Sequence, residues 1–269
     1  MNEIALGMNF FQIKSFIKYC IKSRYRKGYG LHSPFVFELV RDVFYCKYPF
    51  YAFDEIKAFK RQLAHSNETF DMVDYGAGSV NFNGKTRRLS SLARRSSIAS
   101  KYGELLFRLI TYLKPDNILE LGTSIGMSAS YFALADRRRE VNTIEGCSVT
   151  AGYAKRTFDA LKCANVNQFV GQFTDVLPEL VAKHALLDFV FFDGHHEKQA
   201  TLDYFNLCLL KAGNNSVFVF DDIHWSKGME EAWEIIYKHP KVTVSLDLFQ
   251  IGIVFFRQEC QKQHFVVKY

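Results

Sequence analysis

The feature that most constrains the fold is the stretch of residues 117–128, NILELGTSIGMS. It opens with a short apolar run typical of a β-strand, passes through two glycines, Gly122 and Gly126, and continues as an apolar pattern typical of a buried helix. Glycines let a backbone approach a ligand closely, and the start of a helix offers unpaired N–H groups. The stretch therefore predicts an α/β fold with a nucleotide-type ligand at the turn. An ordinary glycine turn without a ligand is the alternative.

The acidic residue at the end of the predicted strand, Glu120, narrows the choice of ligand. A dinucleotide fingerprint reads G-x-G-x-x-G, whereas this turn reads E-x-G-x-x-x-G and lacks the third glycine. S-adenosylmethionine (SAM) carries no phosphate, but its ammonium and sulfonium groups attract a carboxylate. The stretch resembles motif I of the class I SAM-dependent methyltransferases. Under that resemblance, the cofactor contacts at the turn come from Glu120, Gly122, Thr123, Ser124, Gly126 and Ser128.

A second acidic strand end agrees with the first. Residues 141–145, VNTIE, have the pattern of a strand, and Glu145 lies 23 residues after Gly122. In nucleoside-binding α/β folds, an acid about 20 residues beyond the glycine turn accepts the ribose hydroxyls. We therefore expect Glu145, followed by Gly146, at the ribose. A surface glutamate that merely ends a strand is the alternative.

The third predicted strand ends at Gly171. Many class I enzymes have an acid directly after this glycine, which meets the adenine amino group. This chain has Gln172 there, followed by Phe173. Because an amide can also hydrogen-bond adenine, we expect Gly171, Gln172 and Phe173 near the base.

The order of the predicted elements defines the fold class. From residue 101 onward, five strand–helix units are followed by a hairpin formed by VTVSL and QIGIVFF. This pattern predicts a Rossmann-like, doubly wound α/β fold with a mostly parallel seven-stranded sheet that contains one antiparallel strand. We expect residues 100–269 to form a SAM-dependent methyltransferase domain. Residues 1–99 are expected to form a helical extension or lid that supplies much of the acceptor pocket.

Three segments of the extension invite a functional interpretation. Residues 10–25 predict an amphipathic helix, which could bind a membrane surface or a partner; packing on its own domain is the favoured interpretation. Residues 71–79, DMVDYGAGS, imitate the glycine motif, but no buried helix pattern follows, so we expect a turn or part of a lid. The basic segment 85–95 could bind RNA or an anionic substrate, although a solvated face is the favoured interpretation.

Composition excludes several classes of protein. The chain of 269 residues is 48% hydrophobic, with a net charge of +6 that does not require a nucleic-acid partner. Its six cysteines form no C-x-x-C pair, which favours reduced thiols and a cytoplasmic location. No clean signal peptide is present, and no run approaches the roughly 18 apolar residues of a membrane span.

Three aspartates end the fourth and fifth predicted strands. Asp193 follows LDFVFF, and Asp221 with Asp222 follows SVFVF. In an open α/β sheet these ends meet at the ligand-binding edge. Carboxylates crowded together repel each other unless a cation joins them, and Mg²⁺ or another divalent cation prefers such oxygen ligands. Histidines that can act as general bases stand beside them, namely His195, His196 and His224.

Here the resemblance becomes specific, because residues 101–238 are similar to the O-methyltransferases of the catechol and caffeoyl-CoA type. The shared pieces are YGELL, ELGTSIGMSA, IEG, FVGQFTDVLPEL, FFDGHH and FDDIHW. The resemblance implies methyl transfer from SAM to an oxygen of a small-molecule acceptor, with a divalent metal held by Asp193, Asp221 and Asp222. A lysine that is the base in some members falls near His196, so a histidine would replace it. Related metal-free O-methyltransferases share the D-G-x-H pattern at Asp193, Gly194 and His196.

The expected catalytic residues are therefore Asp193, His196 and His224, while Asp193 and His195 also approach the cofactor. Other functions remain open at this stage. An NAD-dependent dehydrogenase is disfavoured because the sequence lacks the third glycine of the dinucleotide fingerprint. A nucleic-acid methyltransferase using residues 85–95 is disfavoured because the sequence lacks both an N-P-P-Y-type tetrapeptide and a catalytic-cysteine motif. A module that binds SAM without turnover is a further alternative, and a homodimer is left open.

Overall fold

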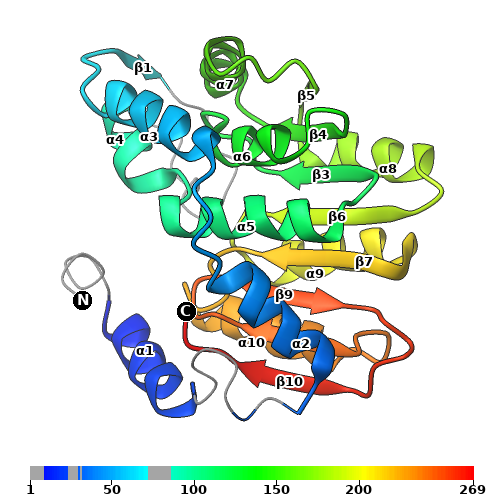
Figure 1. The fold of residues 1–269 in the computed structure, drawn as a ribbon. Helices are drawn as coiled ribbons and strands as arrows, with labels where there is room; N and C mark the ends of the chain where they lie inside the picture. The colour runs from blue at the N-terminus through cyan, green and yellow to red at the C-terminus, as the bar shows by residue number, and fades with distance from the viewer. Residues whose placement is uncertain (1–8, 24–29, 31, 72–85) are drawn as a thin grey trace.

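The computed structural model describes residues 9–23, 30, 32–71 and 86–269. Its centre is a sheet in the order β10-β8-β9-β7-β6-β3-β4-β5 (Figure 1). The strands are β3 (Asn117–Leu121), β4 (Glu140–Glu145), β5 (Val166–Val170), β6 (Leu187–Phe192), β7 (Ala212–Phe220), β8 (Val244–Asp247), β9 (Gly252–Phe255) and β10 (Gln263–Val266).

The strand directions confirm the predicted fold class. β9 pairs antiparallel with both β7 and β8, and the other neighbours pair in parallel. The hairpin predicted near the C-terminus is β8 with β9. Within the described residues the sheet has eight strands, because β10 adds one strand to the predicted seven at the edge beside β8. Its short, partly polar sequence, QHFV, gave no strand signal.

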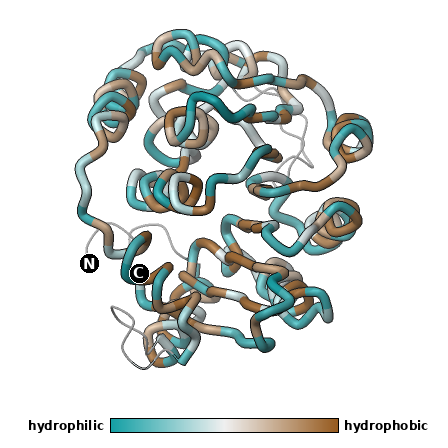
Figure 2. Tube along the Cα trace, turned by 45° about the vertical axis from the view of Figure 1, so that its right-hand side comes forward, coloured by the Kyte–Doolittle hydropathy of each residue, from teal (hydrophilic) through white to brown (hydrophobic). Residues whose placement is uncertain are grey.

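Helices cover both faces of the sheet, so its central strands β3, β6 and β7 are largely buried on both sides. Three helices, α5 (Ser100–Leu113), α6 (Met127–Ala135) and α7 (Ser148–Ala160), contribute to the core on one face. On the other face the core includes residues of α8 (Phe173–Lys183), α9 (Lys198–Leu209) and α10 (Lys227–Lys238). Strand residues alternate between the cores: Phe189 and Phe191 join the first, Val190 and Phe192 the second. In Figure 2 the helices alternate between hydrophobic and hydrophilic colours along their turns.

The described residues before α5 form mostly helices and also a small antiparallel sheet. Ser33 caps the predicted helix start at Pro34, its side chain accepting a hydrogen bond from the Val36 N–H. Residues 72–85, most of the glycine-rich segment 71–79 and the first residue of the basic segment, lie outside the described residues. The elements are α1 (Phe10–Lys22), α2 (Pro34–Leu39), the π-helix η2 (Val40–Phe44), α3 (Tyr51–Ala64), β1 (Thr69–Asp71), β2 (Thr86–Arg88), α4 (Leu89–Ser91) and the π-helix η3 (Leu92–Ser96).

Helix α1 packs on its own chain, but not through its apolar side. The residues it buries are Gln12, Ser15 and Tyr19. The Tyr19 hydroxyl donates to the Val267 carbonyl at 2.7 Å, and the Gln12 amide donates to the Trp225 carbonyl at 3.0 Å. Phe10, Ile13, Ile17 and Ile21 are exposed instead, whereas Phe11 and Phe16 are partly buried. None of the described helices is both long and apolar enough to cross a bilayer.

Candidate active site

The glycine turn joins the carboxyl ends of three neighbouring strands. The N–H groups of Gly122 and Thr123 donate to the Ile144 carbonyl of β4 at 3.0 and 3.1 Å, and the Asp193 N–H donates to the Leu121 carbonyl at 2.9 Å. Gly122 has φ +108°, and a Cβ there would collide with the carbonyl oxygen of Asp193. Only glycine fits this position, since it needs both a left-handed backbone and contact with the end of β6.

Glu145, predicted to meet the ribose, lies against this turn. Its carboxylate accepts hydrogen bonds from the Ser124 N–H at 2.7 Å and from the Cys147 N–H at 2.9 Å. Its carbonyl accepts from the Gly171 N–H at 2.9 Å. The segments predicted to meet the amino-acid, ribose and adenine parts of SAM are thus adjacent.

Glu120 is fully buried beneath the turn. One carboxyl oxygen accepts a hydrogen bond from the Thr143 hydroxyl at 2.5 Å, while the other has no hydrogen-bond partner in the described part of the chain. Burial raises the pKa of Glu120 to about 7, although the hydroxyls of Ser128 and Thr143 partly oppose the shift. Sequence reasoning missed Thr143, because its contact with Glu120 depends on the pairing of β3 with β4.

The three aspartates predicted to lie at this edge are close enough to shift one another's pKa values. Burial, together with the charges of Asp221, Asp222 and Glu120, raises the pKa of Asp193 well above its ordinary value. Burial and the neighbouring Asp222 do the same to Asp221, one of whose oxygens has no hydrogen-bond partner among the described residues. Burial also raises the pKa of Asp222, against the opposing effect of His196. The edge therefore holds a cluster of largely desolvated acids that destabilise one another's ionised forms.

Two of the three candidate histidines lie in the turn after β6. The His196 Nε2 is 3.6 Å from an Asp193 carboxyl oxygen. His195 lies between two aromatic rings, with its ring centroid 5.5 Å from that of Phe173 and 5.7 Å from that of Tyr204. Both histidines have positive φ, 64° and 41°. This turn brings His195 to Phe173 and His196 to Asp193, while Gln172 is exposed.

The third histidine, His224, belongs to a different cluster. Its Nε2 is 3.0 Å from an Asp247 carboxyl oxygen, and its Nδ1 is 3.9 Å from Glu230. Its ring stacks on Phe249, with centroids 5.4 Å apart. The geometry thus groups His196, rather than His224, with the Asp193 carboxylate. Sequence reasoning missed Asp247 and Phe249, whose only signal was the turn of the C-terminal hairpin.

The expected divalent metal has less support from the side-chain geometry. Although Asp193, Asp221 and Asp222 are neighbours, no group of three or more His, Cys, Asp or Glu side chains in the described ranges is arranged to hold a metal ion. The divalent metal therefore stays a prediction.

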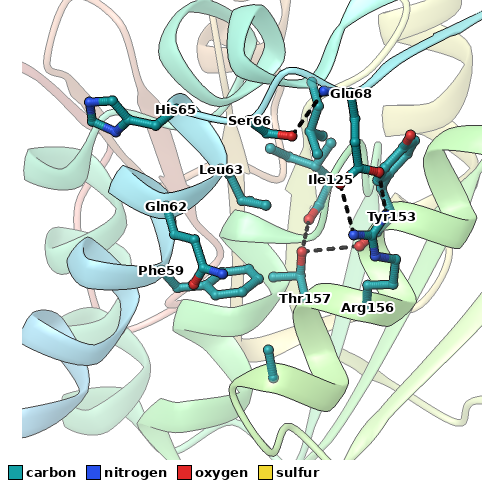
Figure 3. Close-up of a pocket in the computed structure, with 12 residues that line it drawn as sticks. Phe59, Gln62, Leu63, His65, Ser66, Glu68, Ile125, Tyr153, Arg156 and Thr157 are labelled. Atoms are coloured by element: carbon teal, nitrogen blue, oxygen red, sulfur yellow. Dashed lines mark hydrogen bonds and ion pairs between the residues drawn. The ribbon is translucent and has the colours of Figure 1, made fainter.

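A separate cavity of about 410 Å³ lies between α3 and α7 (Figure 3). Arg156 donates two hydrogen bonds across its rim to the carboxylate of Glu68, at 2.7 and 3.0 Å. The Thr157 hydroxyl donates to the Ile125 carbonyl of the glycine turn at 2.7 Å, so this cavity touches the back of the turn. None of the residues predicted for the site lines it.

Comparison with known proteins adds independent findings. Residues 119–223 match a family model described as a methyltransferase domain, a range that includes both glutamates and all three aspartates discussed above. No curated protein sequence matches the chain significantly.

Several solved structures have the same fold. TomG, an O-methyltransferase from Streptomyces achromogenes involved in tomaymycin synthesis and solved with SAM, is 23% identical, covering 60% of this chain and 82% of its own, with a TM-score of 0.52. An O-methyltransferase from Bacillus cereus in complex with SAH is 18% identical, with coverage of 78% and 93% and a TM-score of 0.54. The SAH-bound methyltransferase PaMTH1 from Podospora anserina is 14% identical, with coverage of 94% and 98% and a TM-score of 0.57. The chain therefore shares the fold of these solved methyltransferases, and its residues 119–223 match a methyltransferase domain.

Proposed function

We propose that the protein transfers a methyl group from SAM to an oxygen atom of a small-molecule acceptor. The observation that carries this proposal is the cluster of acids at the glycine turn. Glu120, Asp193 and Asp221 have raised pKa values because burial and neighbouring carboxylates disfavour their ionised forms. A ligand with fixed positive charge would stabilise those ionised forms.

Different residues near the turn would bind different parts of SAM. Glu120 has a carboxyl oxygen without a partner among the described residues, which can accept a hydrogen bond from the ammonium group. Glu145 is positioned to accept the ribose hydroxyls, exchanging its present bonds to Ser124 and Cys147 for them. Phe173 and His195 offer ring surfaces for the adenine.

The chemistry needs an acceptor oxygen in line with the sulfonium methyl. SAM, when bound, supplies a methyl group on a positively charged sulfur. The residues of the chain hold the acceptor at near-attack distance, which removes much of the entropic barrier. His196 takes the hydroxyl proton at the ring nitrogen that does not face Asp193, as the new carbon–oxygen bond forms and the methyl–sulfur bond breaks to leave S-adenosylhomocysteine. The Asp193 carboxyl oxygen, 3.6 Å from Nε2, stabilises the resulting imidazolium.

Assays of methyl transfer test the proposal directly. Purified protein is titrated with SAM in a calorimeter, and formation of S-adenosylhomocysteine is then screened over phenols, sugars and acyl-carrier substrates, with and without Mg²⁺. We expect SAM binding, and turnover with at least one hydroxyl acceptor. The Mg²⁺ arm decides whether a divalent cation assists. Absence of SAM binding would overturn the proposal, and SAM binding without turnover on any class of acceptor would favour a binding module.

An RNA acceptor is the second candidate, because Arg87, Arg88, Arg94 and Arg95 are exposed side chains on one short segment. An RNA substrate would be bound with a steep dependence on salt, since phosphate contacts release counterions. Turnover on RNA that falls steeply with salt, without turnover on small acceptors, would favour this candidate.

Two single substitutions should separate cofactor binding from chemistry. Glu145→Ala should weaken SAM binding about 10- to 100-fold, because it removes charge-assisted hydrogen bonds to the ribose. His196→Ala should leave the Kd of SAM nearly unchanged and lower kcat about 100-fold or more, because it removes the general base. Calorimetry and initial rates at saturating SAM measure the two effects.

Asp193→Ala should also lower kcat strongly, and full activity in this variant would contradict the site assignment. A partly exposed histidine directly after α8, His184, supplies a matched control for His196. His184→Ala should leave both the SAM affinity and kcat unchanged, whereas equal losses in the two histidine variants would exclude a specific role for His196.

A further inference from the structure

Helix α1 carries an exposed apolar stripe, formed by Phe10, Ile13, Ile17 and Ile21. Their side chains are 86, 44, 55 and 71% exposed. Spacings of three and four residues put all four on one side of the helix. A row of large apolar side chains on the surface is unusual for a protein that meets only water.

The opposite side of α1 packs on the rest of the chain, and these contacts fix the rotation of the helix about its own axis. Besides the Tyr19 and Gln12 hydrogen bonds described above, the Ser15 hydroxyl donates to Glu230 at 3.1 Å. The Phe16 ring contacts the Phe249 ring edge-on, with centroids 5.0 Å apart. Since these contacts bury the side of the helix that carries Gln12, Ser15 and Tyr19, the apolar stripe faces outward.

A row of lysines runs beside the stripe. Lys14, Lys18 and Lys22 follow one another at intervals of four residues, and all three are exposed. Lys18 pairs with Glu230 at 2.9 Å, yet its side chain remains 55% exposed. Residues 10–22 contain no aspartate or glutamate, so the outer surface of the helix is apolar and positive. Helices with this combination lie in the headgroup region of anionic bilayers.

A second copy of the chain is a poorer occupant for this surface. Pairing two stripes would bring two lysine rows together, and no acidic residue on α1 would compensate them. An anionic lipid surface meets both properties at once, since apolar side chains enter the acyl boundary and lysines contact phosphates.

We propose that α1 is an interfacial helix that binds an anionic lipid surface through the stripe and the lysine row. The helix packs on Trp225, Phe249 and the Val267 carbonyl, which follow β7, β8 and β10 respectively. It therefore lies at the edge of the sheet that carries Asp221 and Asp222 (Figure 1). Trp225, 53% exposed, lies next to it. Lipid binding would bring this edge close to the bilayer, whichever acceptor the enzyme uses.

Co-flotation with vesicles tests the proposal on the full chain. We use phosphatidylcholine vesicles with and without roughly one-third phosphatidylglycerol, enough to give a clear negative surface potential. The wild type should bind the anionic vesicles, and binding should weaken as salt screens the lysines. The double variant Ile17→Glu/Ile21→Glu should lower the partition coefficient roughly tenfold or more. Lys14→Glu/Lys22→Glu should remove the preference for anionic vesicles.

Leu210→Glu supplies the matched control, because Leu210 is 73% exposed at the end of α9, away from α1. This variant should bind vesicles like the wild type, and all variants should keep the wild-type Tm and SAM affinity. Three results would overturn the proposal. They are no binding of the wild type to anionic vesicles, equal binding to neutral and anionic vesicles, and wild-type binding by the Ile17→Glu/Ile21→Glu variant. Light scattering that shows a wild-type dimer dissociated by Ile17→Glu/Ile21→Glu would identify a second copy as the occupant instead.

Discussion

Glu120→Gln is expected to make the SAM-free protein more stable at pH 8 while weakening its binding of SAM. Glutamine keeps the shape of the side chain and can still accept the hydrogen bond from Thr143. It also removes a buried carboxylate whose ionised form is poorly compensated. The difference between the native pKa of about 7 and the ordinary 4.5 corresponds to about 3 kcal/mol of stability.

The pH dependence identifies the cause of this gain. Because the native carboxyl keeps its proton up to about pH 7 while the unfolded chain loses it near 4.5, the wild type loses stability as pH rises between these values. The variant lacks this loss, so its advantage should be small at pH 4.5, grow with pH and level off above about 7. Urea unfolding across this range measures it. An advantage that does not change with pH would contradict the explanation.

The affinity for SAM should change in the opposite direction. Wild-type Glu120 must be ionised to attract the ammonium group, so SAM should bind more tightly as pH rises toward about 7. Below about pH 7, SAM binding should release the proton of Glu120. Calorimetry in two buffers with different ionisation enthalpies measures the released proton. Glu120→Gln should weaken binding and remove the share of the proton release that belongs to Glu120. Asp159→Asn, the same change at an exposed carboxyl, should alter neither stability nor binding appreciably.

Much of the fold could be predicted because its signals are local. The glycine turn, the buried strands and the helix patterns each lie within a few residues of sequence, and β3, β6 and β7 appear where their apolar runs predicted. The residues directly after these runs necessarily share one edge of a parallel sheet. That is why the sequence alone could group Glu120, Glu145 and Asp193.

The rest depended on contacts between distant segments. Thr143 meets Glu120 because β4 lies beside β3, and His224 meets Asp247 because the hairpin inserts β9 between β7 and β8. Periodicity identified α1 as amphipathic, yet it could not say which side packs on the chain. Hydrogen bonds to Trp225 and Val267, more than 200 residues away, decide that. The prediction of a metal followed from residue types alone and stays a prediction, since a metal site needs several ligands aimed at one point.

Gly122→Ala should cause a large loss of stability, because among the described glycines with a known environment Gly122 has the closest contact for an added Cβ. Alanine is strained at φ +108°, and its Cβ would overlap the Asp193 carbonyl oxygen, which is backbone and cannot turn aside. The glycine turn would have to separate from the end of β6, although the Asp193 N–H bonds Leu121 there. We expect a loss of about 3 kcal/mol or more, which lowers Tm by roughly 6 °C or more.

The same separation should nearly abolish SAM binding, because it displaces Glu120 and the turn from Asp193. Gly152→Ala provides the matched control, since Gly152 lies within α7 and a Cβ there would meet no atom within 4 Å. That substitution should raise stability by about 0.5–1 kcal/mol through its helix propensity, and leave SAM affinity unchanged. Thermal unfolding and calorimetry compare the two variants. Equal Tm values would mean that the turn does not press on the end of β6, and an unchanged SAM affinity in Gly122→Ala would remove the turn from the cofactor site.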